Sequence, residues 1–245
     1  MLSIINITAY RFVQISDYIL PKLQISLQAK AKELDLKGTV LLSVEGINLF
    51  ISGKNDAICT FQNFLKSYSY FHNLEFKKSF SNFQPFNKML VKLKKEIISF
   101  GIHNINPEIY TAPYITPEKL NILLKKRSDL ILMDTRNTFE VEFGTFKNAI
   151  NLHLEKFRDF PDAIKKLPKE LKQLPIVTFC TGGIRCEKAS AYLLDNGYQE
   201  VYQLEGGILN YFEKCGESHF EGHCFVFDGR ESLTSNLEKM APEYT

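Results

Sequence analysis

The sequence predicts two domains: an α+β domain with the element order β-α-β-β-α-β, then a parallel α/β domain. Strand-like runs and two amphipathic helical segments fill residues 1–100. In residues 116–215 short apolar runs alternate with helical segments, which is typical of a parallel sheet. Residues 101–115 carry Pro107 and Pro113 and no periodicity, so we expect a linker there. A chain of 245 residues is long enough for two domains.

The first domain is predicted from the spacing of its apolar residues. Leu20, Leu23 and Leu27 recur at helical spacing within residues 16–36, and Ile58 and Phe61 do so within residues 55–68. The expected strands are residues 4–13, 39–44, 47–52, 74–80 and 89–98, the second and third forming a hairpin. This order favours a ferredoxin-like sandwich, also described as acylphosphatase-like, over residues 1–100.

The second domain opens at a helix start. Thr116 is a good N-cap and Pro117 suits the first helical position. The expected strands are residues 130–134, 176–179 and 201–204, and Asn196-Gly197 should end the helix that precedes the third. We expect residues 216–245 to be a C-terminal extension. In a parallel sheet of this kind, reactive loops lie at the carboxyl ends of strands.

Composition indicates the cellular compartment of the protein better than it indicates its function. The five cysteines, at 59, 180, 186, 215 and 224, are irregularly spaced, which argues against a disulfide framework. The N-terminus lacks a signal-peptide pattern and no run reaches membrane-span length, so we expect a cytoplasmic protein that does not enter a membrane. A net charge of +2 does not decide for or against nucleic acid.

The most informative stretch is the loop from Cys180 to Arg185. An apolar run ends at Cys180, the residues Thr181, Gly182, Gly183 and Ile184 follow, and a helical pattern begins after Arg185. Backbone N–H groups and the positive end of the helix dipole should therefore point at the sulfur. Such a thiol ionises easily and becomes nucleophilic. The alternative is a small buried cysteine that only packs.

The length of this loop distinguishes two kinds of chemistry. Cysteine phosphatases place five residues between cysteine and arginine, enough to wrap a phosphate, whereas four separate Cys180 from Arg185 here. The shorter loop resembles that of rhodaneses, which suits a single sulfur carried as a persulfide. Cys186 follows in the first helical turn. It either packs into the helix or resolves an oxidised Cys180 as a disulfide.

Asp134 and Arg136 follow the first expected strand of the second domain. With the glutamates and Gly144 downstream, they resemble the rhodanese signature. We predict that they support the loop through an ionic network, the alternative being an ordinary stabilising salt bridge.

Near the C-terminus, four potential ligands have a spacing unlike known zinc sites, so we expect no metal. They are Cys215, His219, His223 and Cys224.

Lysines gather in the first domain. Lys92 and Lys94 alternate with apolar residues, which places both on one exposed strand face, and Lys77 and Lys78 precede them. Such lysines can bind an RNA backbone, or they can simply be solvated. Three nearby phenylalanines could stack on bases, although packing in the core is the alternative. They are Phe80, Phe83 and Phe86.

Several strings together resemble one family. The best match is residues 180–190, CTGGIRCEKAS, supported by residues 39–48, 92–98, 204–208 and 224–230. They are similar to the bacterial rhodanese-domain tRNA uridine(34) hydroxylases, over almost the whole chain. The resemblance implies a ferredoxin-like domain followed by a rhodanese-like catalytic domain at 116–215, with Cys180 as the essential cysteine.

The resemblance also implies a reaction. Members hydroxylate carbon 5 of the wobble uridine in tRNA, giving 5-hydroxyuridine, the precursor of 5-oxyacetyl uridine. Dioxygen is the co-substrate, no cofactor is established, and the tRNA anticodon loop is the partner. Two alternatives stay open: a rhodanese-type sulfurtransferase carrying a persulfide on Cys180, and a non-enzymatic RNA-binding or interaction module. The oligomeric state is not implied.

Overall fold

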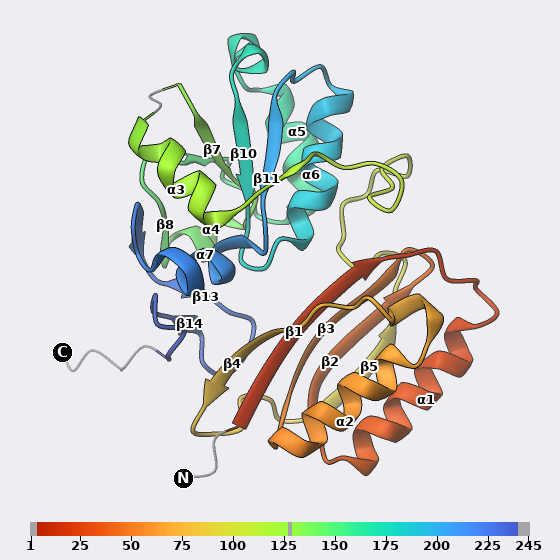
Figure 1. The fold of residues 1–245 in the computed structure, drawn as a ribbon. Helices are drawn as coiled ribbons and strands as arrows, with labels where there is room; N and C mark the ends of the chain where they lie inside the picture. Colours follow the sequence, from red (N-terminus) through yellow and green to blue (C-terminus); the bar gives the residue numbers. More distant parts are fainter. Residues whose placement is uncertain (1–3, 127–128, 240–245) are drawn as a thin grey trace. The chain divides into compact units, whose positions relative to one another are not determined.

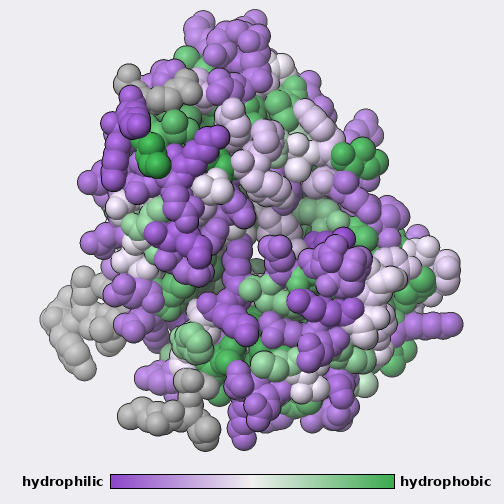
Figure 2. Space-filling model, viewed as in Figure 1, coloured by the Kyte–Doolittle hydropathy of each residue, from purple (hydrophilic) through white to green (hydrophobic). Residues whose placement is uncertain are grey.

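The structure is a computed structural model that describes residues 4–126 and 129–239. The chain divides into two compact units between Ser99 and Phe100. In the view of Figure 2 most of the surface is hydrophilic, and apolar side chains appear as small separate patches. No helix in the described part of the chain is long and apolar enough to cross a membrane.

The first unit is a five-stranded sheet with helices on one face. Its strands lie in the order β4-β1-β3-β2-β5. The first four have the ferredoxin-like arrangement that the sequence predicted, and β5 adds to it in parallel with β2. Figure 1 shows α1 and α2 side by side on this sheet. The elements are β1 (Ile4–Phe12), α1 (Leu20–Glu33), β2 (Lys37–Ser43), β3 (Gly46–Gly53), α2 (Asn55–Lys66), η1 (Ser69–Phe71), β4 (Lys77–Ser81) and β5 (Met89–Leu93).

Three elements of this unit are shorter than the sequence pattern suggested. The first helix begins at Leu20 rather than Ser16, with Pro21 in its first turn. Strand β4 begins at Lys77, because Leu74 bonds back to Phe71 in a turn and is buried in the core. Strand β5 ends at Leu93. Beyond it, the side chains of Glu45 and Asn48 bond the backbone of Ile97, replacing the strand ladder.

The second unit is built on a parallel sheet, as predicted. Its strands lie in the order β6-β11-β10-β7-β9, and every neighbouring pair is parallel. The elements up to the active loop are β6 (Tyr114–Ile115), α3 (Pro117–Lys126), β7 (Ile131–Asp134), α4 (Thr138–Val141), β8 (Gly144–Phe146), β9 (Ile150–Asn151), η2 (Phe157–Asp159), α5 (Phe160–Lys165), η3 (Lys169–Gln173) and β10 (Ile176–Phe179). The elements after it are α6 (Ile184–Asp195), β11 (Val201–Leu204), α7 (Gly207–Cys215), β12 (Phe220–Gly222), β13 (Cys224–Phe225) and β14 (Ser232–Leu233).

Helices cover both faces of this sheet. On one face, apolar residues of α3 and α7 pack on Val177 and Phe179 of the central strand. On the other, Tyr192 of α6 meets Phe160 of α5 and Phe100. The predicted helix signals also hold. The Thr116 hydroxyl accepts the N–H of Lys119, and α6 ends at Asp195 before Asn196-Gly197.

The segments that flank the parallel sheet are more structured than expected. The end of the expected linker, Tyr114–Ile115, forms the edge strand β6 beside β11. Just before it, Thr111 bonds Ser190 of α6, and the Gln203 amide bonds the Ala112 carbonyl. After α7, β12 pairs with β8, and β13 pairs with β14. Residues 111–115 and 220–233 therefore belong to the packed part of the second unit.

Candidate active site

Cys180 lies at the carboxyl end of β10, at the centre of the parallel sheet. Strand β10 pairs with β7 so that Phe179 lies opposite Asp134. The segment that follows Asp134 therefore runs beside the cysteine loop, and Thr135 donates both its N–H and its hydroxyl to the Phe179 carbonyl. Cys180 is 1% exposed. The loop occupies the position that the order of strands and helices predicted.

The loop turns its backbone toward the Cys180 sulfur. The N–H of Gly183 donates to Sγ at 3.1 Å. Gly183 has a φ of 101°, a conformation that L side chains rarely adopt, and it leads directly into α6. The helix N-terminus therefore starts at the sulfur, with its unpaired N–H groups and positive dipole end beside it. This arrangement stabilises a thiolate more than a thiol.

The surroundings of Cys180 hold its pKa low. Burial by itself raises the pKa, because it penalises the charged form. A hydrogen bond from Cys186, the charge of Arg185 and the backbone N–H groups of Arg185 and Gly183 outweigh burial and lower the pKa to about 5. A free cysteine titrates near pH 8.5. Cys180 is thus ionised at neutral pH.

Titration of the thiolate tests this directly. We expect the thiolate absorbance difference between wild type and Cys180→Ser to rise with a midpoint near pH 5 and to be flat from pH 7 to 9. The sign follows from the lowered pKa: the thiolate is lost as the pH falls through 5 and is complete at neutral pH. A midpoint above pH 8 would contradict the stabilised thiolate.

Cys186 lies fully buried beside Cys180. Burial, and then the neighbouring Cys180, raise the pKa of Cys186 well above its ordinary value, so it stays a thiol. Its sulfur lies 3.9 Å from the Thr135 hydroxyl.

We expect Cys186→Ala to raise the pKa of Cys180, because it removes one hydrogen bond to the thiolate. The same absorbance titration measures it, and an unchanged midpoint would show that Cys186 only packs.

Arg185 is held in the site by a buried bidentate ion pair with Glu140. Its Nη1 and Nη2 donate to the two Glu140 carboxylate oxygens at 2.5 and 2.7 Å. Glu140 is fully buried, and it also accepts a 3.4 Å bond from the Thr181 hydroxyl. Glu140 therefore anchors both ends of the loop that follows Cys180.

Asp134 and Arg136 hold the segment that carries Glu140, and the charge of Asp134 also acts on Arg185. The Arg136 guanidinium bonds Asp134 at 2.7–3.2 Å, the Gly144 carbonyl at 2.6 Å and the Glu140 carbonyl at 3.4 Å. Asp134 also accepts the Thr145 hydroxyl at 2.8 Å. The pair thus fixes α4, which carries Glu140, and the start of β8. The sequence pattern assigns the supporting role to this pair and includes Glu140 in the signature without a role of its own. The sequence signal for Glu140 is its position three residues after Asn137, as in a capping box, and the Asn137 N–H donates to the Glu140 carboxylate.

The N-terminus of α7 fixes the backbone of the loop. The N–H groups of Ile208 and Leu209 donate to the carbonyls of Cys180 and Thr181 at 2.9 and 3.1 Å. A Cβ at Gly207 would lie 2.4 Å from the Cys180 carbonyl oxygen. Only glycine therefore lets α7 approach the loop this closely. The sequence signal is the Gly206-Gly207 pair before an apolar helix.

Gly207→Ala tests this approach. We expect it to destabilise the second unit by about 1–3 kcal/mol and to raise the Cys180 pKa, because the new Cβ pushes the loop backbone away from α7. The matched control is Gly216→Ala. Gly216 shares a positive φ, 62° against 67°, but a Cβ there meets nothing within 4 Å. Hydrogen exchange and thiolate titration measure both effects, and equal results for the two variants would rule out the close approach.

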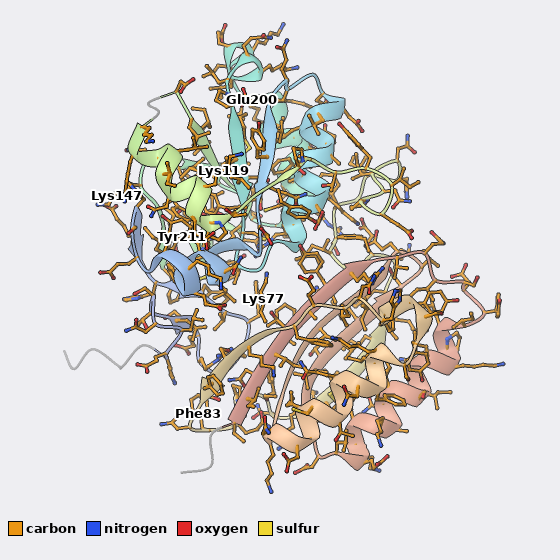
Figure 3. All side chains as sticks on the ribbon, viewed as in Figure 1. Lys77, Phe83, Lys119, Lys147, Glu200 and Tyr211 are labelled. Carbon is orange, nitrogen blue, oxygen red and sulfur yellow. The ribbon has the colours of Figure 1, made fainter. Side chains whose placement is uncertain are left out.

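The predicted RNA-contacting lysines lie on two opposite edges of the first sheet. Lys77 and Lys78 are on β4, Lys92 is on β5, and Lys94 follows it. Three strands separate these edges, which places them roughly 19 Å apart at about 4.8 Å per strand spacing. Figure 3 labels Lys77 on β4. The four lysines thus form two basic edges rather than one patch.

The remaining candidates are three phenylalanines near the lysines and four potential metal ligands near the C-terminus. Phe83 and Phe86 are half-buried, whereas Phe80 is 59% exposed. All five cysteines are free. Within residues 4–126 and 129–239, no three His, Cys, Asp or Glu side chains come together as metal ligands, and Cys215, His219, His223 and Cys224 are no exception.

Comparisons with known proteins find matches to both units and to nearly the whole chain. The UPF0176 acylphosphatase like domain matches residues 4–97, and the rhodanese-like domain matches residues 116–214. A tRNA uridine(34) hydroxylase of Cupriavidus taiwanensis is 44% identical over 99% of this chain and 87% of its own length. The chain belongs to the tRNA uridine(34) hydroxylase family. The family member of Bordetella avium is 46% identical over 97% of this chain and 99% of its own, and that of Legionella pneumophila is 41% identical over 99% and 95%. The resemblance drawn from the sequence strings is confirmed.

Proposed function

We propose that this protein hydroxylates carbon 5 of uridine 34 in tRNA, with dioxygen as co-substrate and Cys180 as the reactive group. The observation that carries the proposal is a buried, stabilised thiolate in a chain that aligns over nearly its whole length with proteins named for this reaction. The anticodon loop is the part of the tRNA that must enter, because position 34 lies in it. We propose that the reaction takes place in the cytoplasm, because its substrate is tRNA.

The thiolate makes the pyrimidine reactive at the correct carbon. Addition of the Cys180 sulfur to carbon 6 of uracil moves the carbon 5–carbon 6 electron pair onto carbon 5 and the adjoining carbonyl. Carbon 5 is then electron-rich and attacks an oxygen electrophile. Loss of the carbon 5 proton and expulsion of the thiolate restore the ring. The Gly183 and Arg185 N–H groups stabilise the departing sulfur anion, as they do in the free enzyme.

The oxygen balance requires a reductant. One atom of dioxygen enters the carbon 5–hydrogen bond as a hydroxyl group. The other leaves as water, taking two electrons and two protons, which we assign to an added thiol reductant. Hydroxylation should therefore need both dioxygen and thiol.

The first unit supplies basic residues for the tRNA backbone. Lys92 and Lys94 on one edge, and Lys77 and Lys78 on the other, give two separate sites for phosphates.

Nucleoside mass spectrometry tests the activity. We expect tRNA from a deletion strain to lack the 5-hydroxyuridine made by this protein, and purified protein to restore it in air with thiol. Anaerobic reactions should give no product. Unchanged tRNA in the deletion strain, together with no product from the purified protein, would refute the proposal.

Sulfur transfer is the second candidate. The four-residue loop and the Gly183 N–H at 3.1 Å from Sγ also suit a persulfide on Cys180. A thiosulfate-to-cyanide assay separates the two. High turnover that depends on Cys180, with normal hydroxylation in the deletion strain, would favour the sulfurtransferase.

A further inference from the structure

Four phenylalanines form an exposed cluster in the second unit, the Phe cluster. Phe139 lies on α4, Phe143 just before β8, Phe225 on β13 and Phe227 two residues later. Phe225 sits at the centre, with its ring centroid 5.1–5.2 Å from those of the other three. The outer three are 41%, 41% and 50% exposed. Side chains this apolar usually bury more of their surface, so water covers ring area that a partner would shield.

The Phe cluster borders the cysteine loop through its neighbours in sequence. Glu140, next to Phe139, binds Arg185. The carbonyl of Gly144, next to Phe143, accepts from Arg136. Cys224, next to Phe225, contacts the Thr181 side chain. Figure 1 shows α4, β8 and β13 gathered at one end of the second unit. Three separate segments thus each place an aromatic residue next to a residue that contacts the cysteine loop or its supporting network.

The chemistry of the rings indicates what covers them. They carry no hydrogen-bonding group, so they can shield a flat π-surface but cannot read base edges. Most of the contacts between them are edge-to-face, which leaves ring faces available for stacking. Cys180 is buried, so a pyrimidine reaches its sulfur only after leaving its own stack. The bases beside it then lose a stacking partner at the rim.

We propose that the Phe cluster is a stacking subsite for the unpaired bases that flank the reacting uridine in a single-stranded RNA loop. This inference rests on the proposed hydroxylase function and extends it to the substrate's neighbouring bases. Such a subsite makes the enzyme bind a single-stranded loop in preference to a duplex, because paired bases cannot offer their faces. Phe139 and Phe227, the most exposed members that touch each other, carry most of the stacking.

The test uses the full chain and a synthetic anticodon-arm hairpin with uridine at the target position. We expect Phe139→Leu with Phe227→Leu to weaken hairpin binding by about 5-fold to 100-fold, because leucine keeps the apolar bulk but offers no π-face. Phe227→Trp should keep the affinity. Tyr110→Leu is the matched control, since Tyr110 is also 50% exposed but belongs to another segment. A duplex of the same stem should bind all variants equally.

Further readouts separate the outcomes. The Cys180 titration should not change in the double leucine variant, which excludes damage to the loop. Unchanged hairpin affinity, or equal losses for hairpin and duplex, would overturn the subsite. Loss of a dimer in sedimentation with unchanged hairpin affinity would instead assign the Phe cluster to a contact between two copies. If wild type binds the hairpin but does not hydroxylate it, the proposed function fails while the binding test stands.

Discussion

Cys180→Ser should abolish hydroxylation of tRNA, by more than about 1,000-fold in rate. Serine preserves the shape of the loop and can accept the Gly183 N–H. It does not ionise at neutral pH, however, so the helix N-terminus and Arg185 have no anion to stabilise. The nucleophile is lost while the site around it stays in place. Mass spectrometry of tRNA incubated with the purified variant measures the loss.

Two controls make this result specific. Cys215→Ser changes a cysteine at the end of α7 whose pKa is raised by burial, so it is a thiol at neutral pH and should retain activity. Thermal melting of Cys180→Ser should stay close to that of wild type. A Cys180→Ser protein that still makes 5-hydroxyuridine at the wild-type rate would remove Cys180 from the mechanism.

The sequence carried most of the information on the loop because that information is local. A strand-length apolar run, a cysteine, two glycines and a helical pattern follow one another directly, and chain order alone puts them at the carboxyl end of a strand. The same holds for the α6 stop at Asn196-Gly197 and the Thr116 cap. Hydrophobic periodicity and helix capping depend on residues only a few positions apart, so they can be recognised in the sequence without knowledge of the fold.

The partners of the loop depend on tertiary packing, which local patterns do not encode. Glu140 and Arg185 lie 45 residues apart and meet only because β7 and β10 are neighbours. Gly207 is needed because β11 lies beside β10, so the N-terminus of α7, which follows β11, meets the loop that follows β10. Likewise, the lysine spacing indicated exposure, but not that β4 and β5 would be opposite edges.

The Glu140–Arg185 pair should dominate the stability of the active-site region. Both side chains are buried, at 0% and 7% exposure, so removing one partner leaves an uncompensated charge or an unsatisfied donor. We expect Glu140→Gln to lower the free energy of opening of the second unit by about 3–5 kcal/mol. That is a large part of the 5–15 kcal/mol typical of a folded domain.

A double-mutant cycle separates pairing from general damage. Arg185→Met should cost about as much as Glu140→Gln, whereas the double variant should cost clearly less than the sum, because it leaves no buried ion without its partner. Hydrogen exchange of α6 peptides measures the opening, with peptides of the first unit as an internal reference. Asp162→Asn, which removes the fully exposed Lys165 pair, should change nothing measurable. Additive single effects would mean that the two charges stabilise the loop independently, and Glu140 would then lose its role as the anchor of Arg185.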